Sequence, residues 1–129
     1  MNFVAVAVGG AIGSTLRYAV GLIMAHWGIT DRAYLPTLIV NLTGSFILGF
    51  FVGFFTQSNK VSSELRAFLT TGLCGGFTTF SALSVEGWLL LEKGNTVEAI
   101  TYLTGSILGG LVSVALGFKL GVALTKIDA

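Results

Sequence analysis

The stretch TGLCGGFTTFS, from Thr71 to Ser81, is the part of the sequence that decides the fold. It lies within an apolar run, yet Gly75-Gly76 followed by Thr78-Thr79 is poor helix-forming sequence. A break inside a membrane helix frees backbone groups that lipid cannot satisfy, so it must face protein or an aqueous cavity. Freed carbonyls can hold a cation, and the new helix N-terminus favours an anion. The alternative is an unbroken helix with a closely packed glycine pair.

The composition of the whole chain predicts a membrane protein. Hydrophobic residues make up 53% of the 129 residues and charged residues only 10%, whereas a soluble domain carries about 25% charge. The mean hydropathy of +0.88 agrees with this interpretation. A net charge of +1 argues against a nucleic-acid partner, which requires a basic patch. Cys74 is the only cysteine, which excludes an intrachain disulfide and a thiolate metal site.

Four hydrophobic runs are each long enough to cross a bilayer, which takes about 20 helical residues. They cover residues 3–25, 34–55, 66–91 and 96–124, and the short connections between them hold most of the charge. Pro36 falls in the first turn of the second run, where its missing N–H costs least. The sequence therefore predicts an all-α membrane protein, a single four-helix transmembrane domain over residues 1–129.

The lysine and arginine residues of the connections give only a weak orientation signal. Lys60, Arg66, Lys119 and Lys126 lie towards one side of the membrane, and Arg32 and Lys93 lie towards the other. A chain with so small a bias could insert both ways and form an antiparallel dimer. A single orientation with a weak signal is the alternative, and charge alone does not separate the two.

The spans also contain polar groups and small residues. Small residues recur every four positions, which lets helices pack closely: Gly9/Gly13, Ser45/Gly49/Gly53, Gly72/Gly76, Gly105/Gly109 and Gly117/Gly121. The most informative polar residues are Arg17, Asn41 and Glu86, since such groups usually face protein or water. Four helices have little interior in which to hide them, so a partner subunit is expected.

Four motifs in order along the chain resemble the Fluc/CrcB fluoride channel family. GGFTTFS (75–81) resembles the family signature, and GGAIGSTLRY (9–18) resembles its first helix. TLIVNL (37–42) is similar to the second helix, SALSVE (81–86) continues the third, and residues 102–106 suit the fourth. The resemblance covers essentially the whole chain.

This resemblance implies an antiparallel, dual-topology homodimer in the cell inner (plasma) membrane, through which fluoride leaves passively and so confers fluoride resistance. It implies two fluoride pathways and a structural sodium ion at the dimer centre, held by the backbone carbonyls of Gly75 and Thr78. Asn41 would lie beside each pathway and Phe80 would line it. Thr37, Tyr102 and Ser106 would continue a polar track, with Ser81 as a further hydroxyl donor. Arg17, Thr79 and Glu86 are other buried polar candidates.

One position departs from the family pattern. The family usually has a second phenylalanine three residues after the first, where this chain has Leu83. The aromatic pairing of the pathway is therefore incomplete, and Ser84 and Tyr102 are the nearby polar substitutes. The positive rim of a phenyl ring lets Phe80 offer its edge to fluoride, although packing is the usual role of a phenylalanine.

Other functions fit the sequence less well. A small multidrug exporter, driven by protons, also has four helices of this size, but it is expected to carry an acid in the first helix, where this chain has Arg17. A structural membrane protein would leave the polar spans unexplained. An enzyme is not expected, because the only histidine, His26, lies at a helix end beside Trp27, as an interfacial residue does.

Overall fold

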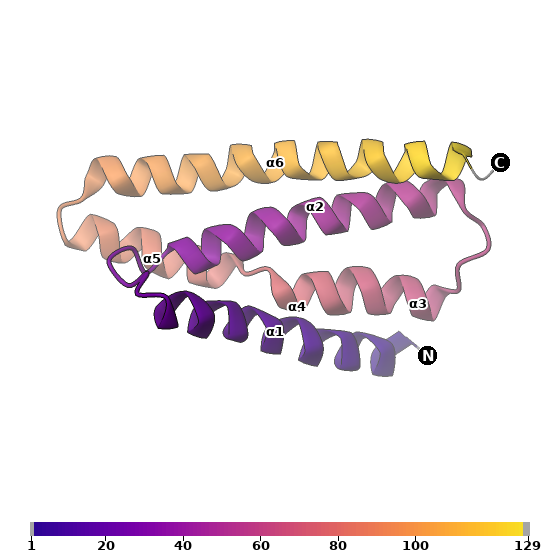
Figure 1. The fold of residues 1–129 in the computed structure, drawn as a ribbon, viewed down its shortest axis with the longest axis horizontal. Helices are drawn as coiled ribbons and strands as arrows, with labels where there is room; N and C mark the ends of the chain where they lie inside the picture. The colour runs from indigo at the N-terminus through magenta and orange to yellow at the C-terminus, as the bar shows by residue number, and fades with distance from the viewer. Residues whose placement is uncertain (1, 128–129) are drawn as a thin grey trace.

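The computed structural model describes residues 2–127 and is entirely helical there, with short connections (Figure 1). Helix α1 covers Asn2–His26, α2 covers Leu35–Gln57 and α6 covers Thr96–Ile127. Together with the segment Ser63–Glu92, they form four helices long and apolar enough to cross a membrane. The prediction of four spans in an all-α protein is thus confirmed, with bounds shifted by up to three residues at each end.

The third span is not one regular helix. It begins with α3 (Ser63–Ala67), continues as the π-helix η1 (Phe68–Cys74) and a short α4 (Gly75–Phe77), and resumes after a break as α5 (Phe80–Glu92). Thr78 and Thr79 both have extended backbone, with ψ of 160° and 119°. The predicted break is confirmed, but Gly75 and Gly76 stay helical and the chain breaks two residues later.

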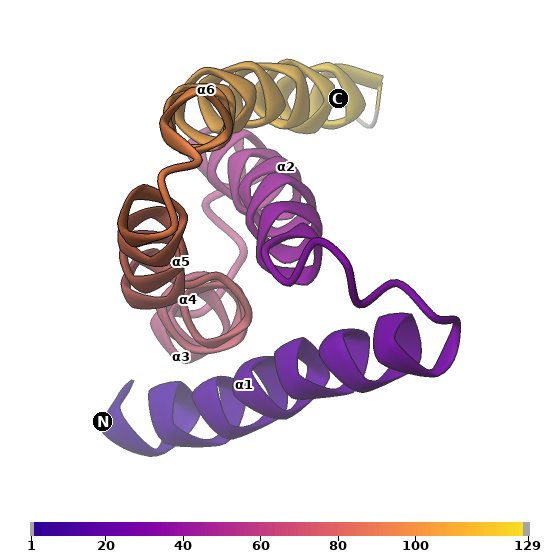
Figure 2. The same cartoon turned by 90° about the vertical axis from the view of Figure 1, so that its left-hand side faces the viewer.

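Helix α1 packs on the first half of the third span through glycines. A Cβ at Gly76 would come within 2.6 Å of the carbonyl oxygen of Gly10, and one at Gly9 within 2.5 Å of that of Phe68. Gly76 therefore serves close packing on α1 rather than the break itself, whereas a Cβ at Gly75 would meet only the Thr70 carbonyl oxygen at 3.8 Å. In the end view, α1 lies across one side of the stack formed by the other helices (Figure 2).

Helices α2 and α6 make the second close contact. Side chains at Gly49 and Gly53 would strike the backbone of Val114 and Phe118, and side chains at Gly117 and Gly121 would strike that of α2. The expected packing role of these small residues is confirmed. The prediction for Gly105 is wrong within one chain, because nothing lies within 4 Å of a Cβ built there.

The outer surface is apolar. Large hydrophobic side chains such as Phe3, Leu111 and Val97 are more than 60% exposed, while the buried apolar residues are few and include Val40 and Ala99. This inversion of the usual soluble pattern is what a helical membrane protein requires. The exposed apolar side chains can contact lipid on one face of the chain and another protein subunit on a different face.

Candidate functional site

The break between α4 and α5 is held by the side chain of Asn41 from α2. Its Nδ2 donates to the carbonyl oxygen of Thr79 at 3.0 Å, and its Oδ1 accepts from the N–H of Thr79 at 2.7 Å. One amide thus satisfies both backbone groups of the extended residue. This pairing replaces the helical bond that Thr79 would otherwise make to Gly75.

Two more side chains replace helical bonds at the break. The Arg17 Nε donates to the carbonyl oxygen of Gly76 at 3.1 Å, and the Thr79 hydroxyl caps α5 by accepting from the N–H of Ala82 at 3.2 Å. Within residues 2–127, no hydrogen bond reaches the carbonyl oxygens of Gly75 and Thr78. The N–H groups of Phe80 and Ser81, at the start of α5, likewise have no partner among these residues.

A second polar cluster joins α2, α5 and α6 through the carboxylate of Glu86. Its Oε1 accepts from the hydroxyl of Thr37 and its Oε2 accepts from the phenol of Tyr102, both at 2.7 Å. Thr37 and Tyr102 are buried and Glu86 is half-buried. The sequence identified all three as polar candidates, and the structure brings them together.

These clusters form two tiers along the helices: the lower tier is the Asn41 cluster at the break, and the upper tier is the Glu86 cluster. Thr37 and Asn41 are four residues apart on α2, as are Tyr102 and Ser106 on α6, so each pair shares one helix face. The lower tier borders a cavity of about 370 Å³ lined by Asn41, Thr79, Phe80, Leu83 and Ser106, among others. Ser106 donates back to the carbonyl of Tyr102, which links the tiers.

The two residues at the aromatic positions lie in different surroundings. Phe80 is 79% exposed on the open side of the lower-tier cavity, whereas Leu83 is only 7% exposed. Within one chain, Phe80 therefore packs against little. The core-packing interpretation of Phe80 does not hold for the isolated chain.

Two predicted site residues lie outside the cavities at the tiers. Ser81 and Ser84 are exposed and line none of the cavities at the tiers. The Ser84 hydroxyl donates to the carbonyl of Phe80 at 3.0 Å, and the Ser81 hydroxyl lies 3.3 Å from that of Thr79. Within one chain, Ser81 therefore reaches the candidate site only through Thr79, and the Ser84 hydroxyl bonds back to its own helix.

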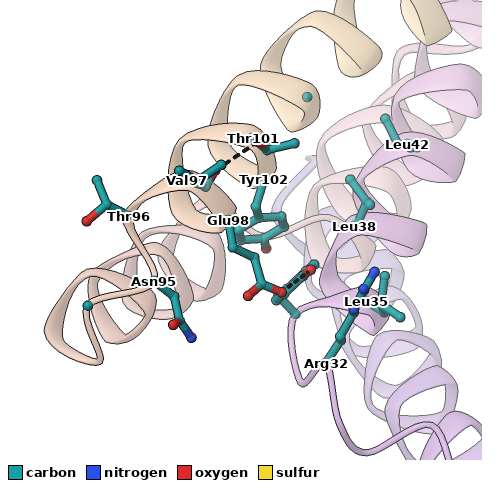
Figure 3. Close-up of a pocket in the computed structure, with 13 residues that line it drawn as sticks. Arg32, Leu35, Leu38, Leu42, Asn95, Thr96, Val97, Glu98, Thr101 and Tyr102 are labelled. Carbon is teal, nitrogen blue, oxygen red and sulfur yellow. Dashed lines mark hydrogen bonds between the residues drawn. The ribbon is translucent and has the colours of Figure 1, made fainter.

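The upper tier opens towards the loops 27–34 and 93–95 through residues that sequence reasoning missed. The Tyr34 phenol donates to Glu98 Oε1 at 2.7 Å, and the centroids of the Tyr34 and Tyr102 rings lie 4.5 Å apart. Figure 3 shows Glu98 and Tyr102 side by side on α6. The bond to Glu98 raises the pKa of the Tyr34 phenol. The spacing of Glu98, Tyr102 and Ser106 at four-residue intervals is the signal that could have placed Glu98 on this face.

A metal at this site would depend on backbone oxygens. Among residues 2–127, no group of three or more His, Cys, Asp and Glu side chains could hold a metal ion. The unpartnered carbonyl oxygens of Gly75 and Thr78 are hard ligands of the kind that alkali and alkaline-earth cations prefer. They fit the cation that the resemblance implies.

Comparisons with known proteins point to one family. Residues 4–118 match the family described as "CrcB-like protein, Camphor Resistance (CrcB)". The chain is 47% identical over 123 residues to a protein of Gloeobacter violaceus, covering 94% of this chain and 96% of the relative. It is 39% identical to a Methylobacterium protein (93% of this chain, 95% of the relative) and 42% to one from Aquifex aeolicus (93% and 96%). All three relatives are named "Fluoride-specific ion channel FluC" and none is named as an enzyme, in agreement with the sequence.

Proposed function

The chain belongs to the CrcB family, and from this we propose that it is a fluoride channel that lets fluoride leave the cell passively across the plasma membrane. The observation that carries the proposal is the match to fluoride-specific channels over more than nine-tenths of the chain. The chain also has four membrane-spanning helices, as a multi-pass channel requires.

The chemistry of the two tiers suits a small anion. Fluoride is strongly hydrated, so a narrow path must replace its water with hydrogen-bond donors. The second hydrogen on Asn41 Nδ2 remains free after the bond to Thr79. The hydroxyls of Thr37 and Ser106, on the faces above and below it, would turn from Glu86 and from the Tyr102 carbonyl to donate to the ion. The exposed edge of Phe80 adds a weak positive contact. None of these groups carries a fixed positive charge that would trap the ion.

The functional unit in this proposal is an antiparallel homodimer with two pathways. Phe80 and the cavity beside it open onto the outside of the single chain, where lipid would otherwise meet polar backbone. A second copy inserted in the opposite orientation would cover this surface, and the weak charge bias of the loops permits such insertion.

A structural sodium ion at the dimer centre is the last part of the proposal. The carbonyls of Gly75 and Thr78 would hold it, because they lack hydrogen-bond partners within the described chain. The ion would neutralise these oxygens and attract the anion. Native mass spectrometry of the purified protein tests both parts: we expect the mass of two chains with sodium bound, and a monomer would contradict the dimer.

The small multidrug exporter has no support from the structure. The first span, Asn2–His26, contains no acidic residue, and Glu86 is engaged by two hydroxyl donors. Such an exporter would couple transport to protons, whereas a channel would not.

The proposed function is tested by fluoride efflux from liposomes containing the purified protein. At neutral pH, where little HF crosses the lipid unaided, we expect fluoride to leave rapidly down its gradient, with no requirement for a proton gradient. Chloride-loaded liposomes should release far less. Protein-free liposomes are the control, and equal fluoride release from them would overturn the proposal.

A further inference from the structure

Two cavities meet at the end of the chain that carries the loops 27–34 and 93–95. The larger, of about 800 Å³, lies between the first turns of α2 and α6. The smaller, of about 150 Å³, is bordered by α5 and reaches Glu86 of the upper tier. Four residues line both cavities, namely Arg32, Tyr34, Asn95 and Glu98.

Two tyrosine–carboxylate pairs border these cavities. Tyr34 donates to Glu98, and Tyr102 donates to Glu86. The two phenol rings touch, with centroids 4.5 Å apart. Figure 3 shows Glu98 reaching from α6 towards the start of α2. Both phenol O–H groups are therefore taken by carboxylates and cannot hydrogen-bond an anion in this arrangement.

Glu98 is the only carboxylate, among the described residues, that lines both cavities. An anion in either cavity therefore lies near its charge. The smaller cavity is bordered by three carboxylates, Asp31, Glu86 and Glu98, against two cations, Arg32 and Lys93. This balance opposes an anion just before the upper tier.

We propose that Glu98, held in place by the Tyr34 phenol, limits the rate at which an anion enters the pathway at the end of the chain that carries the loops 27–34 and 93–95. The inference rests on the proposed function as a fluoride channel. Glu98 repels the ion directly and also occupies a donor that could replace part of the ion's water. Glu98 slows the entry of the ion through its charge and does not itself bind the ion.

Two substitutions that disturb the same hydrogen bond should act in opposite directions. Glu98→Gln keeps an oxygen that accepts from Tyr34 but removes the charge, so fluoride efflux should rise about two- to fourfold, as expected for one charge removed at roughly 10 Å or less. Tyr34→Phe keeps the charge but removes the donor that partly balances it, so efflux should fall. Glu98→Ala, which also frees the Tyr34 hydroxyl, should act as Glu98→Gln does. A purely structural role would lower efflux in all three variants.

Ionic strength gives the second readout. The gain from Glu98→Gln should be large at about 10 mM and small at about 1 M ionic strength, where the Debye lengths are roughly 30 and 3 Å. Glu92→Gln is the matched control, because this exposed carboxylate lies at the same end of the chain and lines neither cavity.

The outcomes separate this inference from the function on which it rests. If the parent protein conducts fluoride and Glu98→Gln gains no more than Glu92→Gln, the inference alone is overturned. A gain that persists unchanged at high ionic strength would also overturn it, since the effect would not be electrostatic. If the parent carries no fluoride, the proposed function fails and this inference falls with it.

Discussion

The two halves of the third span are held by different forces. The half before the break, Ser63–Phe77, packs its backbone on α1 with glycines on both sides and almost no room for a Cβ. The half after it, Phe80–Glu92, is tied to α2 and α6 by hydrogen bonds through Glu86, and Asn41 clamps the break itself. Close backbone packing holds the first half in place, and hydrogen bonds hold the second.

This difference assigns separate tasks to the two halves. Close backbone packing gives a rigid support, and the one group of this half that we propose to meet an ion is the Gly75 carbonyl near the break. A polar seam inside a membrane is costly and is usually tied to function. Substitutions in the first half should therefore decide whether the protein folds, and substitutions in the second half should decide what it conducts.

The largest effect is expected for Gly13→Ala, because Gly13 of α1 packs directly on the first half of the third span. The new Cβ would meet the carbonyl oxygen of Leu73, and backbone cannot move aside as a flexible side chain can. Overpacking of this kind costs about 1–3 kcal/mol or more, so we expect a clear drop in the thermal unfolding midpoint and in the yield of folded protein in detergent. Gly21→Ala on the same helix is the control, since nothing lies within 4 Å of that position. Equal stability of the two variants would show that packing does not hold this half.

A large effect on flux is expected for Asn41→Asp in the second half. The carboxylate can still accept from the N–H of Thr79, but it can no longer donate to the carbonyl oxygen of that residue. It also sets a negative charge beside the path. We expect fluoride efflux to fall about tenfold or more, since an unpaired buried acceptor alone costs about 1–3 kcal/mol.

The matched control for that variant is Asn59→Asp, an exposed amide in the connection between α2 and α3. It should leave efflux unchanged. Near-parental efflux from a well-folded Asn41→Asp variant would separate Asn41 from the anion path and leave it only as the clamp of the break.

The smallest of these effects is expected for Phe80→Ile. This substitution should lower fluoride efflux without affecting folding, which is the behaviour that we expect of the second half. Phe80 is 79% exposed, so the substitution removes an aromatic edge without opening a cavity in the chain. Edge-to-face contacts between two aromatic rings, which use the same positive ring edge, are worth about 0.5–1.5 kcal/mol. A contact of similar strength to fluoride corresponds to a roughly two- to tenfold loss of efflux. Phe3→Ile, at a similarly exposed phenylalanine, is the control. If both variants conduct as the parent does, the aromatic-edge contact is absent.

The four spans and the break could be predicted from the sequence because both follow from local composition. Hydrophobic run length marks the spans, and the glycines and threonines of residues 75–79 mark the break within two residues. The exact position was missed because Gly76 packs on Gly10 of α1, which is distant in the sequence. Local propensity does not contain that information.

The site was only partly predictable for the same reason. Asn41, Thr37 and Tyr102 are visible as polar residues in apolar runs, but their partners are not. That Glu86 joins two of them, and that Asn41 binds the backbone of Thr79, depends on how three helices meet. Tyr34 and Glu98 were missed because they lie at a span boundary, where polar residues are ordinary.

The length of α6 has a consequence for the membrane that the protein can occupy. The helix runs from Thr96 to Ile127, but its uncharged part lies between Glu98 and Lys119. This part has about 20 residues and is roughly 30 Å long, which equals the hydrocarbon thickness of an ordinary bilayer. A thicker bilayer would draw the Glu98 end or the Lys119 end below the headgroups. The lysine can reach back to the surface on its long stem, whereas the shorter glutamate, tied to Tyr34, cannot. Bilayer thickness thus acts unequally on the two ends of this helix. The Glu98 end tolerates less mismatch between the length of the uncharged helix and the thickness of the bilayer.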